Sequence, residues 1–386
     1  MTKMESLVRF SRSPVFRAGF FLLAVVVFFF GLTVPLLGPD EPRYSQVARE
    51  MFMRSDWVTP TLGGFHWFEK PALLYWLQIA SYNLVGVNEF AARFGSALFG
   101  LGVAVCLFLV GRTVRESDSE SSKIDLGQWL AMFAVSTLGI LVFARGASFD
   151  IILTFPLTAS LVGYFIADRS EDNSRRAYAG LLAFYLFMGI AVIAKGLVGF
   201  VFPFAIVGFF HVLSRSLPAK RVFLSVLWGV PVAVAAASLW YLPMYLRHGW
   251  EFIDEFFIQH HFQRYTSNKY QHPQPFHFFF WVLPLMTLPW LPFFAVGVWR
   301  AVKEIISGIT SGRTDDGTDA EKRSLWSLMT FAFAWMTVPL VFFSFSGSKL
   351  PGYILPSVPA AIILAGIAAK RFALRSSARE AGIKIT

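Results

Sequence analysis

Long uncharged runs of apolar residues constrain this chain more than any other feature of its sequence. A helix needs roughly 18–25 such residues to cross the hydrocarbon core of a bilayer. Helices are the expected structure, because a membrane barrel would show short alternating segments instead. The predicted spans are Ala18–Leu37, Phe94–Val110, Leu126–Ala144, Ile151–Ala167, Ala177–Ala194, Gly196–Leu213, Val222–Leu246, Pro275–Trp299, Leu325–Ser348 and Leu350–Ala369.

The composition agrees with a lipid environment. Of the 386 residues, 55% are hydrophobic and only 15% are charged, too few to cover the surface of a soluble protein of this length. The net charge of +10 does not indicate nucleic acid, because the basic residues stand in short clusters between apolar runs. The single cysteine, Cys106, lies inside an apolar run, which excludes a disulfide and a cysteine-based metal site.

The distribution of basic residues predicts how the chain is oriented. An even number of spans places both termini on one side, and most of the 34 Lys and Arg residues fall in the loops of that side. Cytoplasmic loops are the ones that carry this excess, so both termini are expected in the cytoplasm. The predicted organisation is a cytoplasmic N-terminus (1–17), a membrane domain (18–369) and a basic cytoplasmic tail (370–386).

Two long loops are predicted on the opposite, outer side, at 38–93 and 247–274. In the first, Pro71–Val85 is apolar but too short to span, so we expect a helix that lies in the membrane interface. A second short helix is expected to begin at Pro42, because proline suits the first helical turn. The preceding pair Asp40 and Glu41 would then be favoured in its ionised form by the helix dipole.

Ionisable residues of both signs gather on the outer side. Placing charged groups near a bilayer costs free energy, so their positions indicate a functional site. Cations among them could neutralise a phosphate or diphosphate, and carboxylates could act as a base or position a sugar. Glu69 with His261 could hold one divalent metal ion, although two ligands are a weak signal. Because there is no Gly-rich phosphate loop, no nucleotide cofactor is expected. The outer residues are Asp40, Glu41, Arg43, Glu69, Lys70, Arg145, Asp150, Lys195, His260, His261, Arg264 and Lys349.

Several strings in the outer segments occur together in one known family. GPDEPRYSQVAREM, DWVTP, FEKPALLYW and VNEFAAR are followed in order by RGASFDIILTF, AKGLVGFVFP, HHFQRY and SGSKLPGYILP. This series resembles the bacterial lipid A aminoarabinose transferases. These belong, with the protein O-mannosyltransferases, to the GT-C class of membrane glycosyltransferases. The resemblance covers roughly residues 18 to 369 and implies an all-α, polytopic bundle of about ten transmembrane helices with juxtamembrane helices in its first periplasmic loop.

The resemblance also implies a function. Members of this family transfer a sugar, with inversion, from a polyprenyl phosphate to an acceptor at the periplasmic face of the inner membrane. Asp40 resembles the principal catalytic carboxylate and Asp150 the second acidic residue. Arg43, Lys70 and Arg264 resemble ligands of the lipid phosphate, Glu69 and His261 resemble a pair that can hold a divalent metal, and Lys349 and Tyr353 fall in a late binding motif. From its position between two spans, Lys195 is a further candidate phosphate ligand.

Three readings stay open at this point. The first is an enzyme, a glycosyltransferase that uses a polyprenyl-phosphate sugar. The aminoarabinose transferases are longer than this chain, so its acceptor could be lipid A, another envelope glycan or a protein Ser or Thr. A transporter of lipid-linked substrates is disfavoured, because the sequence shows neither an inverted repeat nor a charged relay in mid-membrane. A third reading is a non-catalytic relative that binds a lipid-linked sugar without turnover.

Overall fold

The computed structural model describes residues 14–114, 125–172, 174–263, 274–310 and 320–380, and these residues are almost entirely helical. Its elements in chain order are α2 (Pro14–Phe29), α3 (Asp40–Met53), β1 (Thr61–Leu62), β2 (Phe65–His66), α4 (Leu73–Val85), α5 (Glu89–Gly111), α6 (Leu126–Ser136), α7 (Leu138–Ala144), α8 (Phe149–Asp168), α9 (Arg175–Lys195), α10 (Val198–Ser214), α11 (Lys220–Phe252), η1 (Ile253–Gln263), α13 (Phe278–Met286), α14 (Leu291–Thr310), α15 (Ala320–Ser344), η2 (Pro351–Ser357) and α16 (Val358–Glu380).

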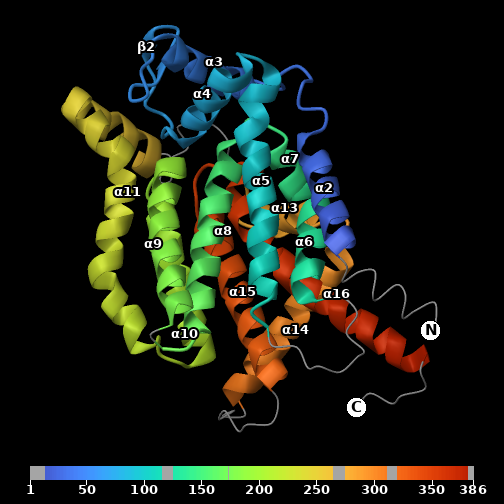
Figure 1. The fold of residues 1–386 in the computed structure, drawn as a ribbon. Helices are drawn as coiled ribbons and strands as arrows, with labels where there is room; N and C mark the ends of the chain where they lie inside the picture. Colours follow the sequence, from blue (N-terminus) through green and yellow to red (C-terminus); the bar gives the residue numbers. More distant parts are fainter. Residues whose placement is uncertain (1–13, 115–124, 173, 264–273, 311–319, 381–386) are drawn as a thin grey trace.

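The long helices form a bundle, and the first loop covers one end of it. Figure 1 shows α3, α4 and the β1–β2 hairpin together at that end, while α16 runs toward the opposite end. The last helix, α16, is almost completely enclosed by its neighbours, whereas α11 lies at the periphery. The molecule is therefore an all-α, polytopic membrane protein, as predicted, with a cap at one end.

The number of membrane-spanning helices differs from the prediction in detail. Among the described residues, six helices are long and apolar enough to cross a membrane, or seven if α6 and α7, which meet at 58°, form one bent span. The predicted eighth span, Pro275–Trp299, is divided into α13 and α14 between Met286 and Leu291. Prolines are plentiful in this stretch, and proline interrupts a helix because it lacks an N–H donor. A count of ten is thus not confirmed.

Helix starts follow local capping chemistry. The side chain of Asn88 accepts a hydrogen bond at the start of α5, and Ser148 does so at the start of α8. At α6, Asp125 and Gln128 form a reciprocal capping box. Close helix contact also has a local cause, because a Cβ on Gly163 of α8 would lie 2.8 Å from the carbonyl oxygen of Gly180 on α9.

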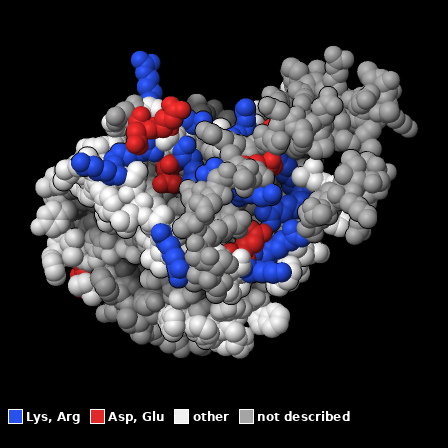
Figure 2. Space-filling view, turned by 90° about the horizontal axis from the view of Figure 1, so that it is seen from below, with Lys and Arg blue, Asp and Glu red and all other residues white. Residues whose placement is uncertain are grey.

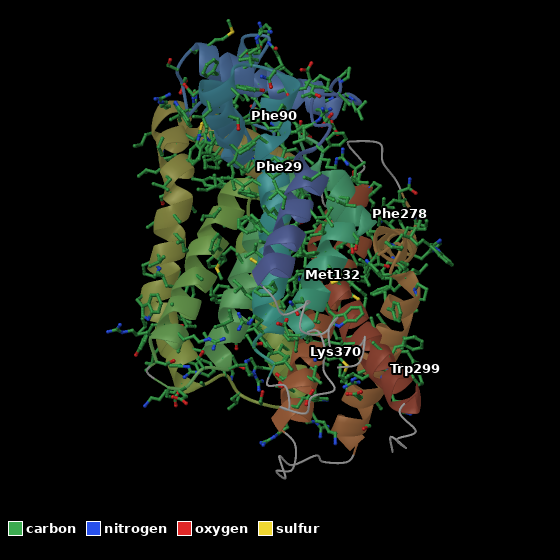
Figure 3. The ribbon with its side chains drawn as sticks, turned by 45° about the vertical axis from the view of Figure 1, so that its right-hand side comes forward. Phe29, Phe90, Met132, Phe278, Trp299 and Lys370 are labelled. Atoms are coloured by element: carbon green, nitrogen blue, oxygen red, sulfur yellow. The ribbon has the colours of Figure 1, made fainter. Side chains whose placement is uncertain are left out.

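Aromatic side chains fill the spaces between the helices. In Figure 3, Phe29 of α2 and Phe90 of α5 lie near the capped end of the bundle. The ring of Phe94 lies 5.4 Å from that of Phe29 and 5.9 Å from that of Phe90, which connects them through two tilted contacts. Trp299 projects outward from α14, where an apolar ring with a polar edge suits a membrane surface.

The two predicted loop helices exist, with two corrections. Helix α3 begins at Asp40 instead of Pro42, so both acidic residues lie within its first turn, where the helix dipole still favours their charge. Its buried face carries Tyr44, Val47 and Met51 at helical spacing. Helix α4 is a short non-spanning helix as expected. It is buried against the protein by residues such as Tyr75 and Gln78, so it does not simply lie on lipid.

Candidate active site

A cavity of about 1480 Å³ lies beneath α3, at the capped end of the bundle. Its lining comes from α3, the segment before α4, the α7–α8 junction, the end of α9 and η2. One part of the wall is charged and another part is apolar. The charged and polar lining residues are Asp40, Glu41, Arg43, Tyr44, Glu69, Lys70, Arg93, Arg145, Ser148, Asp150, Lys195, Ser346 and Tyr353.

Most of the predicted site residues meet in this cavity. The structure brings together seven of them from distant segments: Asp40, Arg43, Glu69, Lys70, Asp150, Lys195 and Tyr353. Arg264 and the side chain of His261 lie outside the described residues. Their predicted roles in phosphate and metal binding stay predictions.

Lys349 is placed differently from the other candidates. It does not line the cavity, and its ammonium donates hydrogen bonds to the carbonyl oxygens of Ser346, at 2.7 Å, and Gln274, at 3.0 Å. The side chain is buried, and burial lowers its pKa. In this arrangement Lys349 satisfies backbone carbonyls beside the end of α15, and its predicted role in donor binding stays a prediction.

Asp40 and Arg43 lie one helical turn apart at the start of α3. Their charged groups approach to 3.4 Å, and 58% of the Asp40 side chain is exposed. The guanidinium of Arg43 also lies 5.9 Å from the centre of the Trp67 ring, which holds it over the cavity by a cation–π contact. Because Asp40 is accessible and only loosely paired, it is available to a ligand in the cavity.

Glu41, the neighbour of Asp40, is instead a structural anchor. Its carboxylate accepts hydrogen bonds from the Arg93 guanidinium and from the backbone N–H groups of Leu37 and Ala147, the last two at 2.6 Å each. Burial alone would raise the pKa of Glu41, but these hydrogen bonds outweigh it and hold the pKa below its usual value. Glu41 therefore ties the start of α3 to the α7–α8 junction as a carboxylate.

Arg93 completes this anchor from α5. Its side chain is 1% exposed, and it donates to the carbonyl oxygens of Leu32, Val34 and Pro35 in addition to Glu41. The fixed fork of a guanidinium suits this set of acceptors. Arginines at the foot of a span often extend toward the membrane surface, but the Arg93 side chain is enclosed by the protein.

Glu69 and Lys70 stand side by side on the segment that leads into α4. The Lys70 ammonium lies 3.0 Å from the Glu69 carboxylate, and both side chains are mostly buried. On α4 itself, the ring of Tyr75 is fully buried and packs against Phe149. Burial, and the nearby Tyr44 and Glu69, raise the pKa of Tyr75 well above its usual value. This phenol is therefore neutral under physiological conditions.

Asp150 and Lys195 form the second charged pair of the cavity. Their side chains form a short salt bridge between the first turn of α8 and the last residue of α9. The Lys195 ammonium also lies 4.9 Å from the centre of the Tyr353 ring. Gly352 makes this packing possible, because a Cβ at that position would lie 1.9 Å from an Asp150 carboxylate oxygen.

Arg145 adds a positive charge that the other lining residues do not balance. It is an exposed side chain at the end of α7, and it donates to the carbonyl oxygen of Phe30 at 2.7 Å. Within the described part of the chain its guanidinium makes no ion pair. The lining thus holds the cations of Arg43, Lys70, Arg93, Arg145 and Lys195 against the carboxylates of Asp40, Glu41, Glu69 and Asp150.

A second part of the cavity wall is apolar. It is built by residues of α7, α10 and α15 and the segments beside them, namely Leu141, Val142, Phe143, Leu197, Val198, Val201, Phe342, Phe343 and Leu350. Three of these side chains, Val142, Leu197 and Val201, are exposed. A cavity with an excess of cations beside an apolar wall fits an anionic, amphiphilic ligand.

Of the predicted metal pair, only the Glu69 side chain belongs to the described residues. Its carboxylate lies 3.0 Å from the Lys70 ammonium, which offsets part of its charge. Its proposed partner His261 lies outside the described side chains. We therefore derive no chemical step through a metal ion at this pair.

The fold and cavity together define a polytopic membrane protein of the GT-C type. Residues 19–266 match the family described as dolichyl-phosphate-mannose-protein mannosyltransferase. The match covers more than half of the chain, and the chain belongs to this family.

Individual relatives agree with this placement. The chain is 32% identical to an undecaprenyl phosphate-α-4-amino-4-deoxy-L-arabinose arabinosyl transferase of Shewanella sediminis, with 89% of this chain and 59% of the relative covered. It is 33% identical to a transferase of the same description from Pseudomonas fluorescens, covering 87% and 56%. The crystal structure of ArnT from Cupriavidus metallidurans bound to undecaprenyl phosphate superposes with a TM-score of 0.75 at 30% identity, covering 93% and 61%. The chain spans less than two thirds of the length of these relatives.

Proposed function

We propose that this protein is an inverting glycosyltransferase that moves a sugar from a polyprenyl phosphate to an acceptor of the cell envelope. The observation that carries this proposal is the cavity beneath α3, in which cationic and carboxylate side chains stand beside an apolar wall. A polyprenyl-phosphate sugar has a matching division into an anionic head and an apolar chain. The similarity to a transferase crystallised with undecaprenyl phosphate supports the same donor class.

Each charged group has a role in this proposal. Arg43, Lys70, Arg145 and Lys195 bind the phosphate and stabilise the negative charge that grows on it as the glycosidic bond breaks. The acceptor oxygen attacks the anomeric carbon from the opposite side, and the bonding electron pair leaves with the phosphate oxygen. Phosphate is a good leaving group, so the departure needs no general acid.

The role of Asp40 depends on the acceptor. If the acceptor is a hydroxyl, Asp40 accepts its proton as the new glycosidic bond forms. If the acceptor is itself a phosphate, as on lipid A, no base is needed, and Asp40 orients the acceptor or stabilises the positive charge of the sugar. Asp150 holds Lys195 toward the cavity and so acts as the second carboxylate of the site.

Transfer to a protein hydroxyl is a second candidate function. The family description itself names protein mannosyltransferases, and their acceptor would be a Ser or Thr side chain. Arabinosyl transferases, however, recur among the curated relatives at about 30% identity. We therefore favour a lipid or glycan acceptor of the envelope, with lipid A as the first to test.

We further propose that the cavity faces the periplasm in the inner membrane and that both termini are cytoplasmic. Figure 2 views the end of the bundle opposite the cavity and shows many basic side chains with fewer acidic ones. This is the distribution expected of a cytoplasmic surface. The exposed basic residues of that end include Arg112, Arg175, Arg176, Arg215, Lys220, Lys303, Lys322 and Arg323.

A transfer assay with a panel of radiolabelled undecaprenyl-phosphate sugars tests the function. Wild-type protein in liposomes, with a membrane extract as acceptor, should move label into a glycolipid or a protein, which identifies the acceptor. Asp40→Asn should lower the rate by about 10²–10⁴-fold if Asp40 is the base. Asp172→Asn, at an exposed aspartate of the opposite end, is the control. Full activity of Asp40→Asn would refute the catalytic assignment, and donor binding without transfer from any donor would favour a non-catalytic protein.

A further inference from the structure

Two imidazoles and a carboxylate converge outside the cavity, on the outer surface of the cap. His66 ends strand β2, while His248 and Glu251 lie near the end of α11. One ligand atom from each of the three side chains lies within 4.8 Å of the other two. The Nδ1 atom of His66 is 3.1 Å from a carboxylate oxygen of Glu251, and the two imidazole rings are 4.7 Å apart.

The two imidazoles rest on a common apolar base. Phe68 is fully buried, and its ring stacks on His66 at 5.0 Å and contacts His248 at 5.0 Å. The same ring packs edge-on against Phe252 of α11, at 5.9 Å. This base holds both imidazoles in place although they come from segments far apart in the sequence.

The surroundings favour a cation over this group. The Thr59 hydroxyl lies 2.9 Å from Nε2 of His248, and a hydrogen bond of this kind on one nitrogen is typical of histidines that bind metal through the other. Glu255 adds a further negative charge that interacts with both His66 and Glu251. Arg247 is the opposing charge, but it is paired with Asp56 at 2.8 Å.

We propose that His66, His248 and Glu251 bind one divalent cation of the zinc class, with water in the fourth position. Two imidazoles and a carboxylate are a ligand set typical of zinc, whereas calcium and magnesium prefer oxygen ligands alone. The His66 and Glu251 side chains are 43% and 58% exposed, which leaves room for a water ligand. This site shares no residue with the Glu69–His261 pair, and it is independent of the proposed sugar transfer.

The location gives this metal a structural role. It joins the β1–β2 hairpin to the end of α11, beside the Phe68–Phe252 and Thr59–His248 contacts. The hairpin continues directly into Trp67, Glu69 and Lys70, which line the cavity. A bound ion therefore braces the segment that carries these side chains.

Metal binding by the purified full chain in detergent tests the proposal. After treatment with a chelator, titration with Zn²⁺ alone should show one equivalent bound and a higher midpoint of thermal unfolding. Co²⁺ at the same site should give visible absorption bands of a low-coordinate complex. The variants His66→Ala and Glu251→Gln should no longer bind this equivalent of Zn²⁺ and should show no thermal shift. Thr59→Val should weaken Zn²⁺ binding by about 10–100-fold.

Two matched variants make the result specific. His277→Ala removes an exposed histidine at the start of α13, and Glu69→Gln removes the competing carboxylate in the cavity; both should keep the equivalent. Unchanged helical circular dichroism and an unchanged metal-free midpoint show that the His66 and Glu251 variants are folded. The proposal is overturned if Zn²⁺ at tens of micromolar does not bind, or if folded His66→Ala and Glu251→Gln keep the equivalent. Because metal stoichiometry is measured without sugar transfer, this test of the metal site is independent of the proposed enzyme activity.

Discussion

The Arg93 guanidinium and the Glu41 carboxylate form two hydrogen bonds, of 3.0 and 2.7 Å, across 52 residues of sequence. Removing one partner of a buried ion pair leaves an unpaired charge, which typically costs about 3–5 kcal/mol. We therefore expect Arg93→Met to lower the free energy of unfolding by about that amount, with an additional contribution from three unsatisfied carbonyl groups. Thermal unfolding in a fixed detergent measures the change.

A conservative variant and a control separate charge from geometry. Arg93→Lys keeps the charge but lacks the planar fork, so it should recover only part of the stability. Arg49→Met removes an exposed arginine of α3 and should change stability by no more than about 0.5 kcal/mol. Equal stability of Arg93→Met and Arg49→Met would contradict the anchoring role of the pair.

Glu41 should also produce an acid-dependent loss of stability. Its pKa in the folded protein lies below the usual value of 4.5, so folding favours the ionised form. The resulting stabilisation is present above pH 4.5 and is lost as the pH falls through the lowered pKa. Thermal unfolding followed from pH 7 to pH 3 should show this decline, and Glu41→Gln, already less stable at neutral pH, should show a shallower one. Parallel curves for both proteins would disprove the assignment.

The Asp150–Lys195 pair can be measured by a double-mutant cycle. Both side chains are mostly buried, so Lys195→Met leaves the Asp150 carboxylate without its partner and should destabilise the protein. Asp150→Asn combined with Lys195→Met should be less destabilising than the sum of the single variants, by about 0.5–3 kcal/mol. Additive effects would show that the two charges do not interact.

Gly352→Ala should disturb the cavity without unfolding the protein. The new methyl group would overlap an Asp150 carboxylate oxygen, so Asp150 must move away and its contact with Lys195 must weaken. We expect weaker binding of undecaprenyl phosphate and slower sugar transfer. Gly208→Ala is the matched control. Gly208 is a helical glycine, and a Cβ added there would have no other atom within 4 Å, so this variant should bind normally. Normal binding and transfer by Gly352→Ala would argue against this role of Asp150.

Arg145→Gln should weaken binding of the lipid phosphate. A hydrogen bond to a charged group contributes about 1.5–3 kcal/mol, which corresponds to about a ten- to hundredfold increase in Kd. Binding of undecaprenyl phosphate without sugar, measured in nanodiscs, isolates this step from catalysis. Arg112→Gln, an exposed arginine at the opposite end of the bundle, should leave Kd unchanged. The same Kd for Arg145→Gln and wild type would remove Arg145 from the site.

Much of the fold follows from the sequence because lipid imposes simple rules. Spans such as Ile151–Ala167 and Ala177–Ala194 match α8 and α9 closely, since apolar length alone defines them. The same rule cannot place breaks within an apolar run. The bend between α6 and α7 and the division of α13 from α14 depend on proline, backbone hydrogen bonds and neighbouring helices, none of which changes the hydropathy of the run.

The candidate site was predicted largely through family strings, because charge position alone does not show which side chains meet. These strings single out Asp40, Lys70 and Asp150, and all three line the cavity. Arg93 was missed because its partners lie on the chain before α3 and within α3, far from it in sequence. The string VNEFAAR contains Arg93, and that motif was the available signal. Lys349 has a comparable motif, but its buried contacts with backbone carbonyls are visible only in three dimensions.

The apolar wall of the cavity determines which concentration scale applies to the donor. Val142, Leu197 and Val201 give the cavity an exposed apolar surface, which suits the hydrocarbon chain of a lipid ligand. For the proposed transferase, the donor is therefore a solute of the membrane, and its molarity in the surrounding water has no kinetic meaning. Diluting a fixed amount of donor with inert phospholipid should slow transfer, whereas enlarging the aqueous volume should not. The rate of transfer should therefore saturate with the mole fraction of donor in the membrane lipid.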